Sequence, residues 1–446
     1  MEMEEKVLKL IEEKDYKSLK QILVELTEQD CAELLMDQEP EMLIKIFRLL
    51  PKSMAAEIFV YFPIETEQEI ISLMSDKDAG AFIDILASDD ATDLFDEMPA
   101  NVVTKILENT TKDTRRDINE LLKYPEDSAG SIMTLEYLDF KEDMSVADCI
   151  NKIRKEGSSK ETINNCYVLD KNRTLLGSVE IKDILLADEN TLVSQIMDDQ
   201  EIYADTLEDQ ELVAEKFKKY DLIAIPVVDS ERRMVGIITI DDVVDIMEEE
   251  TSEDIAKMAA ITPADKPYLN QSVFEIWKTR IPWLLLLMVS ATFTSMIIQK
   301  YEAALAAMVV LTSYIPMFMD TAGNAGSQSS VTIIRSLAIN DIEFKDLFKV
   351  IWKEFRVSIL CGVVLSFCNF LKLLLIDKVG AMVALVVALT LLVTIMLAKF
   401  IGSTLPLIAK KIGFDPAVMA SPFITTIVDA VSLIVYFSFA TALLGI

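Results

Sequence analysis

The sequence contains no histidine. This absence argues against zinc or copper sites built on imidazole and against general-base chemistry that needs a histidine. The few cysteines form no CxxC pair and are typical of reduced, small apolar residues in a cytosolic or membrane setting. They are Cys31, Cys149, Cys166, Cys361 and Cys368. Because a phosphate-binding loop and a nucleophile constellation are also missing, we expect no enzyme.

Positive charge is scarce and unevenly distributed. The 446 residues, enough for two or more domains, hold 42 basic and 73 acidic side chains. Only 9 of the acidic but 13 of the basic side chains lie from Ile276 onward, so the first part carries nearly all of the negative charge. Such a region repels nucleic acid and attracts divalent cations. A well-solvated acidic surface is the alternative. The acidic, amphipathic start of the chain is not expected to be a signal peptide.

Five apolar stretches lie between Ile281 and Leu444, each close to the length that spans a bilayer. They cover Ile281–Ile298, Ala303–Met319, Val357–Ile376, Ala381–Ile401 and Ala417–Leu444. The connections 334–356 and 410–415 are rich in lysine and arginine, which by the positive-inside rule places them in the cytosol. We therefore expect a multi-pass protein of the cell (plasma) membrane with a cytosolic N-terminus and an extracellular C-terminus. A soluble helix bundle is the alternative.

Asp429 is the clearest polar residue inside a predicted span. A carboxylate at that depth is unfavourable unless it faces water or a cation. Pro422 frees a backbone carbonyl one turn away, and Thr425 stacks on Asp429 at a spacing of four residues. Together with Ser421 and Thr426, these oxygen atoms suit Mg²⁺ or Ca²⁺. The alternative is an ion pair with Lys372 or Lys399.

A second polar segment, Gly-Asn-Ala-Gly-Ser-Gln at 323–328, follows the second apolar stretch. Its two glycines are expected to break the helix and to let backbones approach closely. Asn324 and Gln328 would offer neutral oxygen ligands beside a water-filled path. A simple flexible loop is the alternative.

Residues 168–185 repeat as residues 227–244, at a constant offset of 59. Each copy predicts two strands followed by a helix, and amphipathic helices over Val146–Arg154 and Glu208–Lys219 precede the strand pairs. This pattern resembles a tandem pair of CBS domains, α/β modules that often bind adenine nucleotides. A purely structural pair is the alternative.

Short amphipathic helices are predicted before the CBS pair. They alternate with breaks at Leu50-Pro51, Phe62-Pro63 and Met98-Pro99, as in a helical repeat array. After the pair, an acidic helix runs from Asp241 to Met258. Like charges four residues apart destabilise that helix, and a divalent cation would offset the repulsion.

These features together resemble the MgtE family of magnesium channels over essentially the whole chain. The most specific motifs are residues 323–328, Asp-Pro-Ala at 415–417, and the segment from Ser421 to Asp429. The resemblance implies a multi-domain membrane protein: an acidic all-α helical N-terminal domain (1–130), CBS domains (131–194 and 195–245), a plug helix (246–270) and a transmembrane domain of five helices (271–446).

The resemblance also implies how such a protein works. Family members are homodimers with the pore at the dimer interface, where the last-span aspartate coordinates hydrated Mg²⁺. Asp429 matches that aspartate, and we add Thr425 and Asn324 as further pore ligands. Cytosolic Mg²⁺ is expected to bridge acidic residues and close the pore. By local alignment the regulatory ligands are Glu57, Asp89, Asp93, Asp209, Glu211, Asp221, Asp242, Asp245, Glu250, Glu253, Asp254 and Asp415.

Three functions fit this organisation. A Mg²⁺-selective channel for uptake, gated by its own substrate, is preferred; an ion-coupled secondary transporter of divalent cations such as Mg²⁺ or Co²⁺ and a Mg²⁺ receptor without transport remain open. Expected partners are a second copy, Mg²⁺ and the lipid membrane, but not nucleic acid. Some family members bind ATP in the CBS pair, so the resemblance admits ATP as a ligand, although no decisive nucleotide motif is present.

Overall fold

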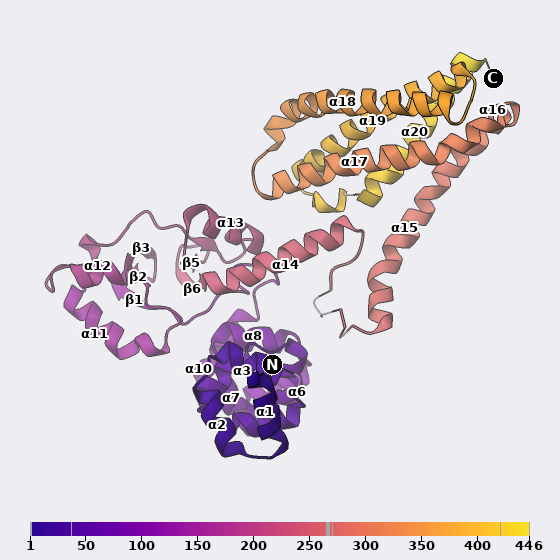
Figure 1. The fold of residues 1–446 in the computed structure, drawn as a ribbon. Coiled ribbons are helices and arrows are strands. Elements are labelled where there is room, and N and C mark those ends of the chain that lie inside the picture. Colours follow the sequence, from indigo (N-terminus) through magenta and orange to yellow (C-terminus); the bar gives the residue numbers. More distant parts are fainter. Residues whose placement is uncertain (1, 37, 265–267, 270, 420, 446) are drawn as a thin grey trace. The chain divides into compact units, whose positions relative to one another are not determined.

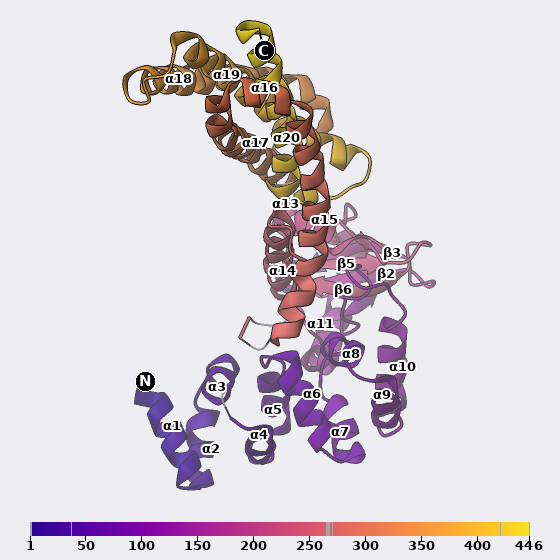
Figure 2. The ribbon, with the colours of Figure 1, turned by 90° about the vertical axis from the view of Figure 1, so that its right-hand side faces the viewer.

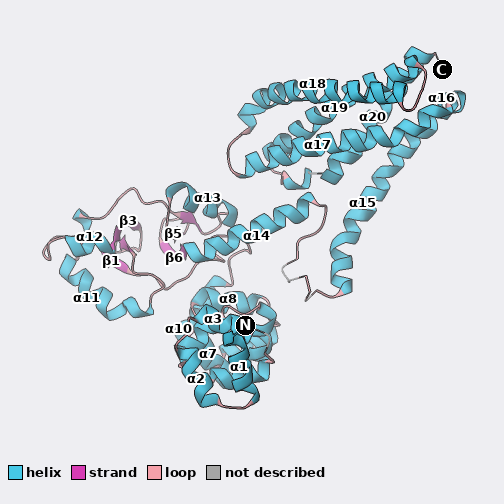
Figure 3. Cartoon of the chain, in the orientation of Figure 1, coloured by secondary structure: helices cyan, strands magenta, loops and turns pink. Residues whose placement is uncertain are grey.

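The computed structural model describes residues 2–36, 38–264, 268–269, 271–419 and 421–445 (Figure 1). The chain divides into two compact units, Met1–Met247 and Glu248–Ile446, which are described separately. The first unit joins a helical domain to the strand-containing CBS region, and the described part of the second consists of helices joined by loops (Figure 3). Residues 265–267 and 270 of the predicted plug lie outside the described residues.

The described residues 2–121 form ten short helices. Most helices pack on the helix two places along the chain, as α3 does on α5 and α8 on α10, and Figure 2 shows them following one another in a row. The predicted helical repeat array is therefore present. The helices are α1 (Glu2–Glu12), α2 (Tyr16–Val24), α3 (Glu28–Leu35), α4 (Pro40–Phe47), α5 (Lys52–Phe59), α6 (Ile64–Leu73), α7 (Asp76–Ile83), α8 (Ser88–Asp96), α9 (Ala100–Leu107) and α10 (Lys112–Leu121).

Proline determines where several of these helices begin. Pro51, Pro63 and Pro99 are the N-cap residues of α5, α6 and α9. A residue without a backbone N–H is best tolerated at a helix start, where that group has no intrahelical partner. The three predicted Pro breaks are thus confirmed. Apolar side chains from all ten helices form one core, in which the Phe59 and Phe82 rings meet edge to face.

Two three-stranded sheets of the same design follow. β1 (Asp139–Lys141) pairs parallel with β2 (Asn165–Leu169), which pairs antiparallel with β3 (Leu175–Glu180). β4 (Ala204–Asp205), β5 (Ala224–Val228) and β6 (Met234–Thr239) repeat this order. Each hairpin has a register shift at the same place, Val168/Leu169 and Val227/Val228, again 59 residues apart. The internal repeat in the sequence is a repeat in the fold.

Four helices and two 3-10 turns accompany these sheets. The amphipathic segments predicted before the strand pairs are α11 (Val146–Glu156) and α13 (Gln210–Tyr220). After the strands come α12 (Ile181–Leu186) and α14 (Ile240–Met258); α14 begins one residue before the predicted Asp241 and ends at the predicted Met258. The 3-10 turns are Gly157–Ser159 and Val193–Gln195.

The second unit is built from long helices. They are α15 (Val273–Lys300), α17 (Ile315–Ala338), α18 (Leu347–Leu375), α19 (Ala381–Lys411) and α20 (Ser421–Leu444), with the short α16 (Glu302–Ala307) and 3-10 turns at Val309–Tyr314, Phe344–Asp346 and Ala417–Met419. Among the described residues, four segments are long and apolar enough to cross a membrane: Val273–Lys300, Phe344–Leu375, Ala381–Lys411 and Ala417–Leu444.

The predicted second span is wrong as a single helix. Residues 303–319 are divided among α16, the 3-10 turn and the first turn of α17. The helix that continues from there, α17, carries Asp320, Asn324, Gln328 and Arg335, which lower its mean hydropathy. It packs on α19 and α20, whereas these four polar side chains are exposed within the described unit. A fifth crossing by α17 stays a prediction.

The expected helix break at residues 323–328 is also wrong, because α17 runs straight through this segment. The glycines serve close packing instead. A Cβ added to Gly402 of α19 would lie 2.2 Å from the carbonyl oxygen of Gly326, and one on Gly326 would lie 2.9 Å from Ile424 of α20. Small residues at such crossings let membrane helices approach, and neighbouring packing compensates for their low helix propensity.

Candidate functional site

The second unit has a polar hollow of about 410 Å³ between α17 and α20. Residues four apart on each helix face it: Asp320 and Asn324 from α17, and Thr425 and Asp429 from α20. The full lining is Pro316, Met319, Asp320, Gly323, Asn324, Thr425 and Asp429. All three predicted pore residues, Asn324, Thr425 and Asp429, are therefore brought together.

Asp429 lacks the basic partner that the alternative interpretation required. Its Oδ1 atom is buried and has no hydrogen-bond partner among the described residues. Lys372 instead pairs with Asp377 at 2.9 Å, and Lys399 lies 3.8 Å from Glu354. A buried carboxylate oxygen without a donor is unfavourable unless a cation or water compensates it. The side chain of Ser421, another predicted oxygen donor, lies outside the described residues.

Asp320 is a functional candidate that the sequence reasoning missed. It is exposed on α17, and its Oδ1 accepts a hydrogen bond of 3.2 Å from the amide of Asn324. This bond leaves the amide oxygen of Asn324 as an acceptor. The Asp-x-x-x-Asn spacing was the available signal, since it places both side chains on one helical face. Two carboxylates and neutral oxygens suit a hard, hydrated divalent cation.

A second acidic cluster lies within the first unit. Asp89 and Asp90, at the start of α8, interact electrostatically with Asp242 at the start of α14. Burial first, and Asp242 second, raise the pKa of Asp90 to about 7. Burial and the adjacent Asp241 raise the pKa of Asp242 to about 6. The structure therefore brings together two predicted regulatory residues, Asp89 and Asp242, with carboxylates that repel one another.

Glu136, which the sequence reasoning missed, is fixed in this cluster. Its Oε2 accepts hydrogen bonds of 2.6 Å from the hydroxyls of Ser88 and Thr134. Ser88 is the first residue of α8 and Thr134 precedes the first sheet, so the glutamate links the helical domain to the CBS region. Its charge raises the pKa of Asp89 further, after the larger effects of burial, Asp90 and Asp242.

Three other predicted regulatory residues, Asp209, Glu211 and Asp221, lie on α13 or at its ends. The Asp209 carboxylate accepts the backbone N–H of Glu211 at 2.9 Å and thereby caps α13. Asp221 ends the same helix in the left-handed conformation, with φ of 52°. Asp209 and Asp221 thus have structural roles at the two helix ends.

The remaining predicted residues of the first unit are exposed and dispersed. Glu57, on α5, has its pKa raised by partial burial and by Glu28. Asp93 lies near Glu67, whose pKa burial, Asp90 and Asp93 raise to about 8. Asp245 is exposed one turn after the start of α14. In the described ranges, no group of three or more His, Cys, Asp or Glu side chains has metal-chelating geometry.

The end of α14 approaches the segment before α20 within the second unit. Glu253, Asp254 and Asp415, all predicted as regulatory ligands, come together there around Lys257. The Lys257 Nζ atom lies 2.7 Å from Glu253 and 2.8 Å from Asp415. Burial and Asp415 raise the pKa of Asp254. Glu250 is half-buried one turn earlier. Lys257 was not predicted, although its i,i+4 spacing from Glu253 was a visible signal.

Comparison with known proteins places these sites in a family. A family model described as "Divalent cation transporter" matches residues 315–439, and a model of the MgtE intracellular N domain matches 26–127. CBS-domain models match 129–190 and 193–249. A curated magnesium transporter MgtE of Thermus thermophilus is 34% identical, covering 99% of both chains. The chain belongs to the MgtE family.

Other MgtE relatives agree with this assignment and confirm the resemblance. The magnesium transporter MgtE of Bacillus subtilis is 29% identical over 93% of this chain and 94% of its own length. A crystal structure of the cytosolic domain of the Mg²⁺ channel MgtE in complex with ATP is 32% identical, with a TM-score of 0.51, and covers 54% of this chain and 98% of that one. A crystal structure of the soluble part of a magnesium transporter shares the fold, at 24% identity and a TM-score of 0.53. It covers 56% of this chain and 98% of that one.

Proposed function

We propose that this chain is a Mg²⁺-selective channel that carries hydrated Mg²⁺ past Asp429. The observation that carries the proposal is the buried, partnerless Oδ1 of Asp429 beside the hollow between α17 and α20. Relatives across the whole length are named magnesium transporters, which supports Mg²⁺ over other divalent cations as the substrate.

The side chains around the hollow suit an ion that keeps its water. Mg²⁺ dehydrates reluctantly and is usually held by one or two carboxylates with several waters retained. Asp429 and Asp320 supply charge, while Asn324 and Thr425 offer oxygen atoms to the water shell. Binding of this kind is weak enough to permit release. Asp320 and Asn324 are exposed, and we propose that a second copy of the chain completes the pathway.

The acidic clusters would provide the gate. Carboxylates at the start of α8 and of α14 repel each other when no cation is present, and Mg²⁺ would neutralise them and favour one closed arrangement. Glu253, Asp254 and Asp415 would respond in the same way at the other end of α14. Transported Mg²⁺ would thus inhibit its own uptake. ATP, present in the related cytosolic domain, is a further candidate ligand of the CBS pair.

Electrophysiology of the reconstituted full-length protein tests the pore. Discrete openings that carry Mg²⁺ are expected, and the substitution Asp429→Ala should abolish selective Mg²⁺ current. Asp377→Asn, which removes a carboxylate paired with Lys372 away from the hollow, is the matched control and should conduct normally. Unchanged current and selectivity in D429A would refute the pore assignment. Flux coupled to another ion's gradient, or no flux at all, would favour the transporter or the receptor.

A further inference from the structure

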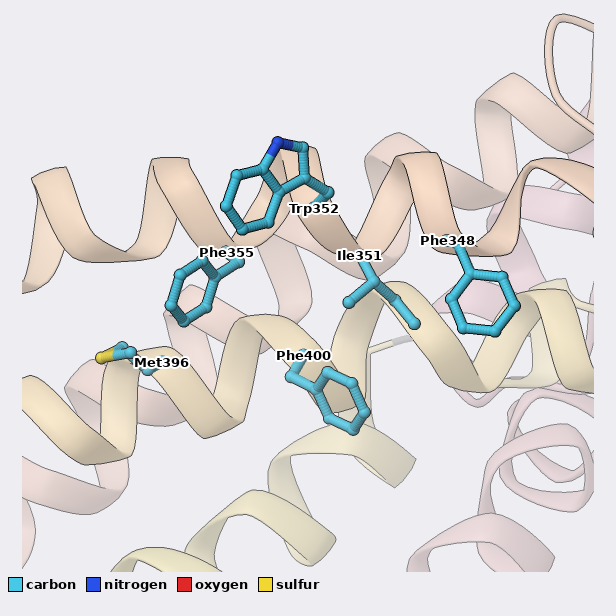
Figure 4. A pocket seen from close by; sticks show the side chains of 6 residues that line it. All are labelled: Phe348, Ile351, Trp352, Phe355, Met396 and Phe400. Carbon is cyan, nitrogen blue, oxygen red and sulfur yellow. The ribbon is translucent and has the colours of Figure 1, made fainter.

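The outer face of α18 and α19 carries an apolar groove that the ion pathway does not use. Its volume is about 450 Å³, within the range of about 300–1,000 Å³ typical of sites for small molecules. Figure 4 shows side chains of both helices around it. The lining consists of Phe348, Ile351, Trp352, Phe355, Met396 and Phe400. Phe348 is 82% and Trp352 59% exposed, so in the described unit these large rings lie open to the surroundings.

A basic stripe flanks this groove. Lys349, Lys353 and Arg356 follow one another at spacings of four and three residues, on the side of α18 next to the groove residues. The Arg356 guanidinium lies 5.8 Å from the centre of the Trp352 ring. Lys349 is paired with Asp346 at 2.6 Å, whereas Lys353 is exposed and pairs with no described residue. The positive charge beside the apolar groove is therefore only partly neutralised.

The groove lies at the basic end of the helix pair. The C-terminal end of α19 meets the turn before α18, where Lys411 Nζ lies 4.0 Å from the Phe344 ring centre. Aromatic rings next to lysines and arginines are typical of the membrane–water interface. From this end α18 continues as an apolar segment long enough to cross the bilayer. A molecule in the groove would have its polar end beside the stripe and its apolar part along the helices.

We propose that this groove binds an anionic phospholipid, with an acyl chain against Phe348, Phe355 and Phe400 and the phosphate beside Lys349 and Lys353. Basic pockets between transmembrane helices are known recognition sites for anionic head groups. A second copy of the chain fits less well. A two-fold contact centred on the groove would bring the basic stripes of two copies toward each other. The charge of the stripe is complementary to an anion.

The position of Trp352 allows a direct test. The chain has three tryptophans, and the double substitution W277F/W283F leaves Trp352 as the sole reporter in the full-length protein. This protein would be reconstituted in phosphatidylcholine vesicles that contain either brominated phosphatidylglycerol or brominated phosphatidylcholine at the same mole fraction. Bromine quenches tryptophan fluorescence on close contact, so the quenching reports which lipid lies at the groove.

The anionic brominated lipid should quench Trp352 markedly more than the zwitterionic one. A basic residue near the membrane surface contributes enough to enrich an anionic lipid about fivefold. The substitution K349Q/K353Q should therefore remove most of the difference. K378Q, which removes an exposed charge after the far end of α18, should preserve it.

Two outcomes would overturn the proposal. Equal quenching by both lipids would mean that the groove contacts ordinary boundary lipid without head-group selection. Protection of Trp352 from both lipids would mean that another protein surface, such as a second copy, covers the groove. The measurement does not depend on ion flux, so its failure is distinct from failure of the proposed channel function.

Discussion

The Nζ atom of Lys257 lies 2.8 Å from Oδ2 of Asp415, where the end of α14 approaches the segment before α20. The same ammonium group lies 2.7 Å from Glu253. A cation of the chain itself thus occupies the centre of three acidic residues that we propose as Mg²⁺ ligands. Such an internal cation offsets the repulsion of the carboxylates when Mg²⁺ is scarce, and Mg²⁺ must compete with it.

Replacement of Lys257 by glutamine should therefore strengthen inhibition by Mg²⁺. Two partly exposed ion pairs together contribute about 1 kcal/mol, so the Mg²⁺ concentration for half-closure should fall about fivefold. The measurement is channel current during a Mg²⁺ titration on the cytosolic side. K345Q, which breaks the exposed pair of Lys345 with Glu343, is the control and should leave the titration unchanged. A requirement for more Mg²⁺ in K257Q would show that Lys257 itself stabilises the closed state.

The buried carboxylates of α8 and α14 predict a pH-dependent stability. The pKa of Asp90 is raised to about 7, mainly by burial and then by Asp242. Because the folded-state pKa lies above the unfolded one, the folded chain binds more protons, and stability decreases as the pH rises through the folded pKa. Asp90 alone should lower the unfolding free energy by about 1.4 kcal/mol between pH 6 and 8.

Thermal unfolding of the full-length protein without divalent cations, measured from pH 6 to 8, checks this prediction. D90N removes the titrating group and should flatten the dependence. D78N, on the exposed first turn of α7, is the control and should keep the wild-type slope. A stability that rises with pH in the wild type would contradict the assigned direction.

Much of the fold could be predicted from local pattern. Pro51, Pro63 and Pro99 mark helix starts because of their own covalent geometry, and the repeat at offset 59 reappears in both sheets with the same register shift. These features depend on short-range chemistry, which a single sequence reveals.

The predictions from sequence failed where contacts between distant parts of the chain determine the local structure. The glycines of residues 323–328 predicted a helix break, but Gly326 lies against Gly402 of α19 and Gly323 lies against Thr425 of α20 within one continuous helix. Lys257 and Asp415 are far apart in sequence, so their ion pair depends on how the end of α14 meets the segment before α20. The sequence did predict Asp429, Thr425 and Asn324, because oxygen ligands in or beside an apolar segment are conspicuous. It missed Asp320, because the predicted second span ended at Met319, whereas α17 continues through this residue.

The contact between Gly402 and Gly326 predicts that a single methyl group destabilises the helical unit. In an open helix, Gly→Ala would be favourable. Here the added carbon would lie 2.2 Å from a backbone oxygen, and such overpacking should lower the unfolding free energy of G402A by about 1–3 kcal/mol. Thermal unfolding in detergent measures the change. Gly380 has no atom within 4 Å of the corresponding position, so G380A is the control; equal effects would contradict the packing argument.

A buried polar chain links three helices of the second unit. Lys399 Nζ donates to the Ser329 hydroxyl at 3.2 Å, and that hydroxyl donates to Glu354 at 2.7 Å. The Lys399 side chain is only 8% exposed. The substitution E354Q would leave the ammonium buried without its counter-charge, which should lower the unfolding free energy by about 3 kcal/mol.

The double substitution E354L/K399M separates this charge effect from lost packing. It removes both charges and replaces them with apolar groups of similar size, so it should be less destabilising than E354Q alone, because a buried pair contributes little net stability compared with hydrophobic residues. Thermal unfolding of both variants in detergent gives the comparison. A double variant E354L/K399M that is no more stable than E354Q would contradict this expectation. The ion pair would then contribute net stability, and these residues would hold α17, α18 and α19 together through charge.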